Sequence, residues 1–309
     1  MMNKGQEKMD RDGAVATIGF FDGVHRGHRF LIEQVKEVAS RNKLKSMVIT
    51  FDKHPRQVLN SEYMPQMLTT LEEKVEKIKG TGVDICEVLA FDKDMAALSA
   101  YDFMKSVLKE KLNVNFLVIG YDNRFGHNRS EGFEDYERYG KEIGIEVIRA
   151  KAFVLNGVNV SSSVTRSFLT EGEVEMAEMC LGYKYCLSGN VIDGVKEGRK
   201  MGYPTANIDI SGICKLIPAN GVYAVKAYWN GAGKEYMAMM NIGNRPTFNG
   251  KTTTLEVNII DYSGDLYGKT LTVAFVKRLR TEKRFPSEKA LMAQLEKDRE
   301  ATKECFSNI

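Results

Sequence analysis

Residues 15–31 read VATIGFFDGVHRGHRFL, an apolar run followed by a glycine-containing turn and then by a segment with helical periodicity. His25 and His28 lie three positions apart at the start of that segment. This order predicts a buried strand, a tight loop and the N-terminus of a helix. In an open parallel sheet, ligands bind beyond the carboxyl ends of the strands, where loops lead into helices. The stretch therefore predicts an α/β fold and the position of a ligand site within it.

The alternation of short apolar runs with helical segments continues to about residue 149. Thr70 and Glu73 have the spacing of a capping box, so a helix is expected to begin there. Strands that alternate with helices are typical of a parallel sheet with crossover helices. The first domain is therefore expected to be a doubly wound nucleotide-binding domain. Its further strands are expected at residues 46–51, 83–89, 115–120 and 145–150.

The pattern changes after residues 161–182, which are expected to form one or two helices. Short strands then follow one another with Gly, Asn and Asp turns and without intervening helices, which favours an antiparallel barrel. The pair Pro286–Ser287 predicts the start of a C-terminal helix. We therefore expect a first domain at residues 1–183 and a mostly antiparallel β-barrel domain at residues 184–309.

The composition limits the class of protein. A chain of 309 residues is long enough that two domains are expected rather than one. The net charge of +3 is too small for a nucleic-acid-binding surface, so no nucleic-acid partner is expected. The polar N-terminus and the lack of a long apolar run predict neither export nor contact with a membrane. The five cysteines are scattered without a CxxC pair, which indicates neither disulfides nor zinc and fits a cytoplasmic location.

The loop before the two histidines has the features of a phosphate site. Glycines let the backbone approach a phosphate, and a helix N-terminus offers unpaired N–H groups and a partial positive charge. Histidines on the first helical turn can stabilise charge that develops on a phosphate in transit. The arrangement suggests attack on the α-phosphate of a nucleotide, with pyrophosphate as the leaving group. Two other interpretations stay open: histidines that only cap the helix or face solvent, and a pair of zinc ligands.

The segment GFFDGVHRGH (19–28) resembles the GxFDGVHxGH signature of the HxGH nucleotidyltransferases. Within them it is most similar to the adenylylating module of prokaryotic bifunctional riboflavin kinase/FMN adenylyltransferases, or FAD synthetases. Three further segments follow in that family's order: TFDKHP (50–55), GYDNRFG (120–126) and VSSSVTR (160–166). The resemblance implies a Rossmann-like fold for the first domain.

The resemblance also implies roles for individual residues. His25 and His28 would be catalytic, and serine hydroxyls and the fork of an arginine would donate to phosphate oxygens. The nucleotide would be held by Gly19, Asp22, His25, His28, Asp122, Ser162, Ser163 and Arg166. The flavin would lie near Phe51, Asp52 and His54, although Phe51 is equally suited to the core and His54 to a simple strand exit.

Three residues depart from the family's pattern. Phe20 occupies a position where many relatives have a small polar residue, Asn123 stands where an aromatic residue is common, and Ser163 replaces a threonine. None of these changes removes a phosphate-binding group. They concern the details of the flavin and adenine contacts rather than the reaction.

The second domain carries its own motif in GVKEGRKMGYPTANI (194–208). Three glycines spaced four apart are by themselves more typical of a hairpin loop than of a ligand site. The PTAN tetrapeptide at its end resembles the signature of the riboflavin kinases, a β-barrel family. This resemblance implies that ATP and Mg²⁺ are bound by Gly198, Gly202, Thr205 and Asn207, the last two as metal ligands.

Glu256 lies in the alternating segment TLEVNIID (254–261), opposite in direction to Leu255 and Val257. A glutamate on the outer side of a strand is ordinarily a surface residue. The resemblance to riboflavin kinases implies instead a catalytic base, which takes the proton from the ribityl 5′-hydroxyl as that oxygen attacks the γ-phosphate. Arg280 is assigned to flavin binding, although arginines at strand ends are often only solvated.

The resemblance covers nearly the whole chain and implies two successive reactions. Riboflavin and ATP would give FMN and ADP, and FMN and ATP would then give FAD and pyrophosphate, both with Mg²⁺. Two alternatives are a chain with one live activity and a non-catalytic flavin-sensing module, which would show damage at Glu256, Asn207 or the histidines. A third, a cytidylyltransferase acting on a head-group alcohol, leaves the PTAN segment without a purpose. The sequence leaves the oligomeric state open.

Overall fold

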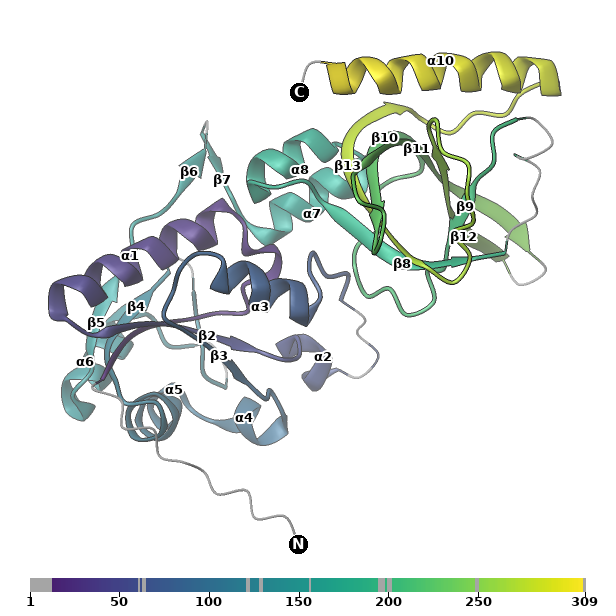
Figure 1. The fold of residues 1–309 in the computed structure, drawn as a ribbon. Coiled ribbons are helices and arrows are strands. Elements are labelled where there is room, and N and C mark those ends of the chain that lie inside the picture. Colours follow the sequence, from purple (N-terminus) through teal and green to yellow (C-terminus); the bar gives the residue numbers. More distant parts are fainter. Residues whose placement is uncertain are drawn as a thin grey trace, which may run out of the picture. The chain divides into compact units, whose positions relative to one another are not determined.

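The chain forms two compact units, one made of Met1–Pro65 and Thr69–Val160 and the other of Gln66–Leu68 and Ser161–Ile309. Each is treated by itself below, with the element labels of Figure 1. The computed structural model describes residues 13–60, 62, 65–120, 123–127, 130–155, 157–193, 198, 202–247 and 250–307.

The first unit is built on a five-stranded parallel sheet in the order β3-β2-β1-β4-β5. Strand order reverses on either side of β1, so the carboxyl ends of β1 and β4 form the switch point where doubly wound sheets bind ligands. The five expected strands are confirmed as β1 (Ala14–Ile18), β2 (Lys45–Phe51), β3 (Ile85–Leu89), β4 (Val114–Ile119) and β5 (Glu146–Arg149).

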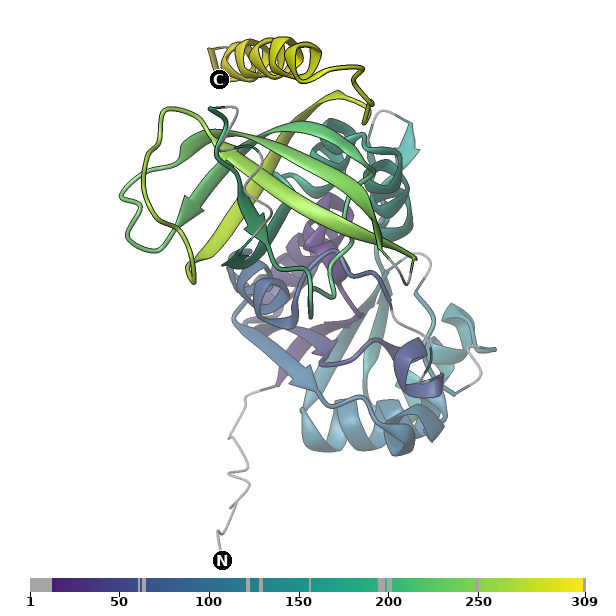
Figure 2. The same cartoon turned by 90° about the vertical axis from the view of Figure 1, so that its right-hand side faces the viewer.

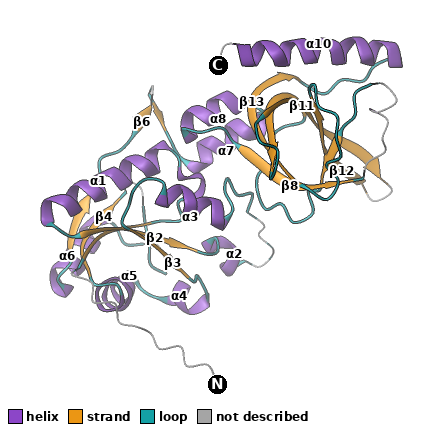
Figure 3. Ribbon diagram, in the orientation of Figure 1, coloured by secondary structure: helices purple, strands orange, loops and turns teal. Residues whose placement is uncertain are grey.

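Both faces of this sheet are covered by helices (Figure 3). Every residue of β1 is buried, and Val15 packs in a different core cluster from Ala14, Ala16 and Ile18. The helices are α1 (Arg26–Asn42), α2 (Pro55–Leu59), α3 (Leu71–Lys79), α4 (Lys93–Ala97), α5 (Ala100–Asp102), η2 (Phe103–Lys111) and α6 (Phe133–Ile143), with a short turn η1 (Asp22–Val24) and a hairpin of β6 (Val154–Leu155) and β7 (Val158–Asn159).

The helix α3 begins with the expected capping box. Thr70 Oγ1 accepts from the Glu73 N–H at 3.2 Å, and Glu73 Oε2 accepts from the Thr70 N–H at 3.0 Å. Two unpaired donors at the helix start are thereby satisfied. The cap fixes where α3 starts and so which of its side chains face the sheet.

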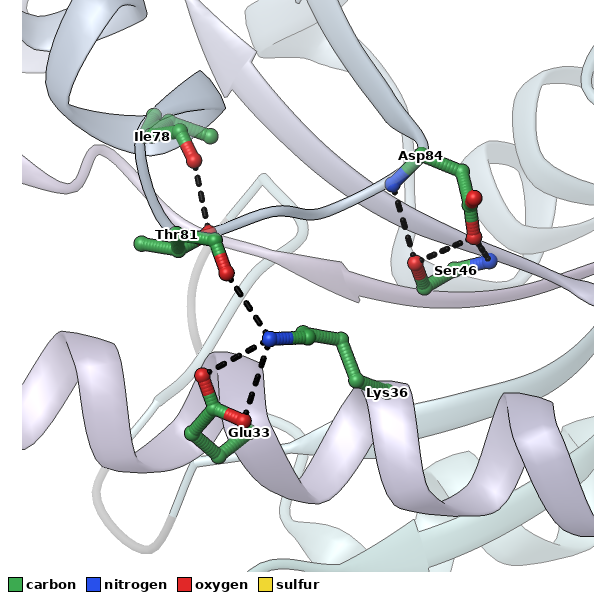
Figure 4. A network of polar contacts seen from close by, with 6 residues as sticks. All are labelled: Glu33, Lys36, Ser46, Ile78, Thr81 and Asp84. Carbon is green, nitrogen blue, oxygen red and sulfur yellow. Dashed lines mark hydrogen bonds and ion pairs between the residues drawn. The ribbon is translucent and has the colours of Figure 1, made fainter.

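A polar network fastens the amino ends of β2 and β3 (Figure 4). The Asp84 carboxylate accepts from the Ser46 N–H at 2.8 Å and from the Ser46 hydroxyl at 2.6 Å. These bonds hold the pKa of Asp84 below its ordinary value. Beside them, Lys36 Nζ donates to the Thr81 carbonyl at 2.8 Å and pairs with Glu33 at 2.9 Å. The network lies at the sheet edge opposite the ligand-binding ends of the strands, so it serves the fold.

The second unit is a closed antiparallel barrel in the order β10-β11-β12-β9-β8-β13 (Figure 2). Leu255, Val257 and Ile259 point into its core, as the alternation predicts. The expected barrel and C-terminal helix are confirmed as β8 (Cys186–Ile192), β9 (Ala206–Ile208), β10 (Gly221–Trp229), β11 (Tyr236–Thr247), β12 (Gly250–Ile259), β13 (Thr270–Arg280) and α10 (Glu288–Ser307).

The helices α7 (Ser162–Glu171) and α8 (Val174–Leu181) pack against the barrel core through Leu169, Val174 and Leu181. Arg278 of β13 adds a hydrogen bond from its guanidinium to the Glu171 carbonyl at 2.9 Å. These two helices were expected in the first domain, whereas their contacts place them in the second compact unit. The functional boundary at residue 183 stays a prediction.

Among the residues described, no helix combines the length and the apolar composition needed to cross a bilayer.

Candidate functional site

The loop after β1 makes a tight left-handed turn before α1 starts. Phe21 has φ of 55°, Gly23 has φ of 78° and Val24 has φ of 37°. His25 is then the N-cap of α1, and its Nδ1 accepts from the His28 N–H at 3.2 Å. The capping interpretation is therefore confirmed for His25. It does not compete with a ligand role, because a neutral imidazole that accepts at Nδ1 has its N–H donor at Nε2.

The two histidine rings stack face to face, with centroids 3.6 Å apart and planes at 17°. The Nδ1 atom of His28 is enclosed and has no hydrogen-bond partner among the described residues. Burial lowers the pKa of His28 well below its ordinary value, and the charges of His25 and Lys74 add to that shift. A buried nitrogen without a partner is uncommon. His28 is thus held in its neutral form near neutral pH, with an unpartnered nitrogen at the switch point.

Asp22 has a visible role in shaping this loop. Its carboxylate is buried and accepts from both the N–H and the hydroxyl of Thr69, each at 3.1 Å. The same hydroxyl accepts from the Gly23 N–H at 3.1 Å. Gly19 is also engaged, since its N–H donates to the Ile49 carbonyl at 3.1 Å. Phosphate contacts of Gly19 and Asp22 stay predictions, whereas their contacts in the loop are structural facts.

The residues expected near the flavin come together at the end of β2. Asp52 Oδ1 accepts from the Phe91 N–H at 2.8 Å, and the Phe51 ring meets the Phe91 ring edge-on at 5.1 Å. His54 caps α2 by accepting from the Arg56 N–H at 3.2 Å, and its ring contacts Phe20 at 4.9 Å.

A small apolar pocket of about 60 Å³ opens beside these residues. Phe51 is buried in its wall, so the core interpretation is confirmed for this ring, and its contact with the flavin stays a prediction. Of the two further residues singled out on the loop after β4, Asp122 lies outside the described residues. Asn123 donates from Nδ2 to the Ile18 carbonyl at 2.5 Å and so ties that loop to the end of β1. The small apolar pocket at the end of β2 is lined by Ile18, Phe51, Phe91, Met95, Ala96, Leu98, Phe103, Phe125 and Gly126.

Lys74 is a site residue that the sequence reasoning missed. Its side chain is 2% exposed, its Nζ donates to the Phe51 carbonyl at 2.7 Å, and it lies 4.0 Å from the centre of the Phe20 ring. Burial lowers its pKa to about 8, against the opposing effect of the Asp22 carboxylate. The available signal was its spacing, because Lys74 lies four residues before Ile78 on the face of α3 that turns inward.

Ser162, Ser163 and Arg166 lie on the first turns of α7. The N-cap is Ser161, whose hydroxyl accepts from the Val164 N–H at 3.2 Å. Arg166 donates from Nε to the Gln66 carbonyl at 2.9 Å. All three belong to the second compact unit, and their roles at the phosphates stay predictions.

In the barrel, Glu256 and Asn207 are direct partners across the β12–β9 ladder. Side chains opposite one another in an antiparallel pair lie close, with Cβ atoms about 4.5–5.5 Å apart. Next to them, Asn258 Nδ2 donates to the Pro204 carbonyl at 2.8 Å and fixes the start of the PTAN segment. The barrel thus presents a carboxylate, an amide and the Thr205 hydroxyl on neighbouring positions.

The glycine-rich segment is described only at Gly198 and from Gly202 onward. Gly202 has φ of +80°, which favours glycine, and the Gly198 carbonyl accepts from the Tyr203 N–H at 2.8 Å. A pocket of about 600 Å³ adjoins the PTAN segment, large enough for a nucleotide. Its lining comprises Val191, Pro204, Thr205, Ala206, Val257, Ile259, Tyr262, Ser263, Gly264, Asp265, Leu266 and Tyr267.

Arg280, whose side chain is 13% exposed, forms an ion pair with the buried Asp298 of α10. Arg280 Nε lies 3.1 Å from both carboxylate oxygens, and Nη2 lies 2.8 Å from Oδ2. Gln294 also donates to Asp298, at 2.9 Å. The guanidinium therefore ties β13 to α10, and its predicted contact with the flavin stays a prediction.

These features define a class of protein. A doubly wound domain with a stacked histidine pair at its switch point, joined to a barrel with a carboxylate facing an amide, is the architecture of an ATP-dependent transferase with two sites. Within the described residues, no group of three or more His, Cys, Asp or Glu side chains is placed to hold a metal ion. ATP-dependent kinases and nucleotidyltransferases generally need a divalent cation.

Comparisons with known proteins specify the family. The FAD synthetase family matches residues 7–164, and the riboflavin kinase family matches residues 181–306. The bifunctional riboflavin kinase/FMN adenylyltransferase of Escherichia coli K12 is 37% identical over 96% of this chain and 94% of its own length. The protein of the same description from Listeria monocytogenes is 37% identical over 96% and 93%. The chain belongs to this bifunctional family and is a transferase of flavin cofactor biosynthesis.

A solved structure supports the fold. A crystal structure from Streptococcus pneumoniae described as a macrolide-efflux protein superposes with a TM-score of 0.85 at 31% identity, over 96% of both chains. The comparisons confirm the family, the fold class and the type of enzyme expected from the sequence. The roles of single residues are not addressed by them.

Proposed function

We propose that the chain makes FAD from riboflavin in two steps, with the kinase reaction in the barrel and the adenylylation in the doubly wound unit. The observation that carries the proposal is that each unit has its own polar cluster in a ligand position. One is the stacked pair of His25 and His28 at the switch point, and the other is the pair of Glu256 and Asn207 on the barrel. One chain therefore has the groups for both transfers.

In the adenylylation, an oxygen of the FMN phosphate attacks the α-phosphorus of ATP. A new P–O bond forms there, the bond from the α-phosphorus to the bridging oxygen breaks, and pyrophosphate leaves with its electron pair. The imidazoles of His25 and His28 donate to the phosphate oxygens on which charge develops. The N-terminus of α1 adds a partial positive charge at the same place. Ser162, Ser163 and Arg166 are proposed as donors to the β- and γ-phosphates.

The flavin ring of FMN binds near the apolar pocket at the end of β2. Aromatic side chains such as Phe51 and Phe91 suit an isoalloxazine ring because they offer flat apolar surface. Asp52 and His54 hold this wall through their contacts with the backbone.

In the kinase reaction, the ribityl 5′-hydroxyl attacks the γ-phosphorus of ATP, Glu256 takes the hydroxyl proton, and ADP leaves. The nucleotide lies in the pocket beside the PTAN segment, with Gly198 and Gly202 giving its phosphates room. We propose Mg²⁺ as the cation, since the Thr205 hydroxyl and the Asn207 amide oxygen are hard ligands that suit it. When bound, such an ion neutralises charge on the transferred phosphoryl group.

A chromatographic time course of riboflavin, FMN and FAD, after mixing the full chain with riboflavin, ATP and Mg²⁺, tests the proposal. FMN should appear first and then give way to FAD. FMN that accumulates without FAD would mean that only the kinase is live. The absence of both products, with the flavin still bound, would instead favour a flavin-sensing module.

We also propose a cytoplasmic location. None of the five cysteines, all of which are described, forms a disulfide. Cysteines that form no disulfide fit a reducing compartment. Cell fractionation with an antibody against the chain tests this proposal.

A further inference from the structure

Lys74 lies where three parts of the candidate adenylylation site meet. It extends from α3 to the end of β2, where its Nζ donates to the Phe51 carbonyl at 2.7 Å. It also lies 4.0 Å from the centre of the Phe20 ring, which belongs to the loop after β1. A cation over an aromatic face is attracted by the ring, more strongly when water is excluded. One ammonium group therefore connects the loop after β1, at the switch point, with the carboxyl end of the neighbouring strand β2.

Burying a lysine is unfavourable, which makes this position informative. The side chain is 2% exposed, and no carboxylate forms an ion pair with it in the described part of the chain. An apolar residue of the same length would fit α3 at lower cost, because a charge taken out of water loses hydration free energy. The buried ammonium is instead held by the Phe51 carbonyl and the Phe20 ring, both at the candidate site.

Four titratable groups, each from a different part of the unit, interact electrostatically with Lys74. Asp22 lies on the loop before α1, Asp52 follows β2, and Cys86 lies on β3; these groups favour its charged form. The fourth, His28 of α1, is itself held neutral in part by the charge of Lys74. Lys74 thus acts electrostatically on the histidine with the unpaired buried nitrogen.

We propose that Lys74 is a positioning residue for adenylylation: its ammonium holds the Phe20 loop and the Phe51 strand end together. The inference rests on the proposed adenylylation site in this unit. It is independent of the kinase reaction, which takes place in the barrel.

The test compares the full chain with K74M, which removes the charge at similar length, and K74R, which keeps a charge. K79M, on an exposed position of the same helix, is the matched control. The adenylylation kcat and the KM for FMN and for ATP are measured from pH 6 to 10. Circular dichroism and the melting curve of each variant report whether the chain is folded, and the riboflavin kinase rate reports whether the barrel is intact.

We expect K74M to lower the adenylylation kcat by about tenfold or more, as the displacement of catalytic groups does. The kinase rate of K74M, and both rates of K79M, should equal those of the unaltered chain. Adenylylation by the unaltered chain should decline above about pH 8, where Lys74 loses its proton. K74R should move that decline to higher pH, since arginine keeps its charge.

Full adenylylation by K74M with an unchanged pH profile would overturn the proposal. A pH profile of K74R identical to that of the unaltered chain would also overturn it. The alkaline decline would then not arise from loss of the Lys74 proton. If the unaltered chain makes no FAD at all, the proposed function of this unit fails instead, and the two failures are thereby distinguished.

Discussion

Glu256 on β12 and Asn207 on β9 are direct cross-strand partners, although 49 positions (256 − 207) separate them in the chain. The pairing places a carboxylate beside the PTAN segment on the outer face of the barrel wall. The neighbours Leu255 and Val257 are buried in the core, so the direction of Glu256 is fixed by the same alternation that buries them.

We predict that E256Q lowers the riboflavin kinase rate by about 10²- to 10⁴-fold, the usual contribution of a general base. Adenylylation of added FMN should be unchanged, because it takes place in the other unit. E235Q, an exposed glutamate on the β10–β11 turn, is the control. If the kinase rate of E256Q stays within about twofold of the rate of the unaltered chain, Glu256 is not the general base.

We predict the converse pattern for H28N. Loss of a donor to a transition-state phosphate oxygen typically lowers kcat by about 10²- to 10³-fold, and here the loss should be confined to the formation of FAD. H127N, at an exposed histidine of the same unit, should leave both rates unchanged. An unaltered rate of FAD formation by H28N would remove His28 from the mechanism.

The pH dependence of His28 follows from its lowered pKa. Between that pKa and the ordinary value of 6.5, the unfolded chain binds the proton more readily than the folded chain. His28 therefore contributes stability that is present near neutral pH and is lost as the pH falls through this window. An NMR titration of the imidazole signals, with H28N to assign the resonance, should show His28 titrating well below 6.5. A midpoint at or above 6.5 would contradict the burial of its charge.

The ion pair between Arg280 and Asp298 should matter for stability. Removing one partner of a buried pair typically costs about 3–5 kcal/mol because the other charge stays buried. R280M and D298N should each lower the melting temperature, and the double variant should be less affected than their sum. R284M, at an exposed arginine nearby, is the control. If R280M alone raises the KM for riboflavin without a change in melting temperature, the flavin role predicted from the sequence is favoured.

A change at Asn207 should alter the Mg²⁺ requirement of the kinase reaction but not that of the adenylylation. Chelation with EDTA should stop both reactions, and added Mg²⁺ should restore them. N207A should raise the Mg²⁺ concentration needed for half-maximal kinase activity and leave that for adenylylation unchanged. N230A, on an exposed turn, should behave as the unaltered chain does. An equal Mg²⁺ requirement in N207A and N230A would show that Asn207 is not a ligand.

The short-range features of this protein were predictable. The strand, loop and helix around His25 and His28, the cap at Thr70, and the alternation at Glu256 all depend on residues within a few positions of one another. Backbone geometry and side-chain periodicity act over that range, so the sequence pattern is sufficient. The two-domain order was predictable for the same reason. Strands alternate with helices in the first domain, whereas strands follow one another without helices in the second.

The roles of several charged residues were decided only by the tertiary structure. Lys74 reaches Phe51 and Phe20, Asp22 holds Thr69, and Arg280 pairs with Asp298.

The two helices α7 and α8 likewise pack with the barrel although their sequence continues the pattern of the first domain. Contacts between distant segments depend on which faces are buried together and in which register, and no local pattern specifies this. The sequence by itself therefore determined the elements, the fold class and the family. Folding decided which charges lie close enough to act on one another.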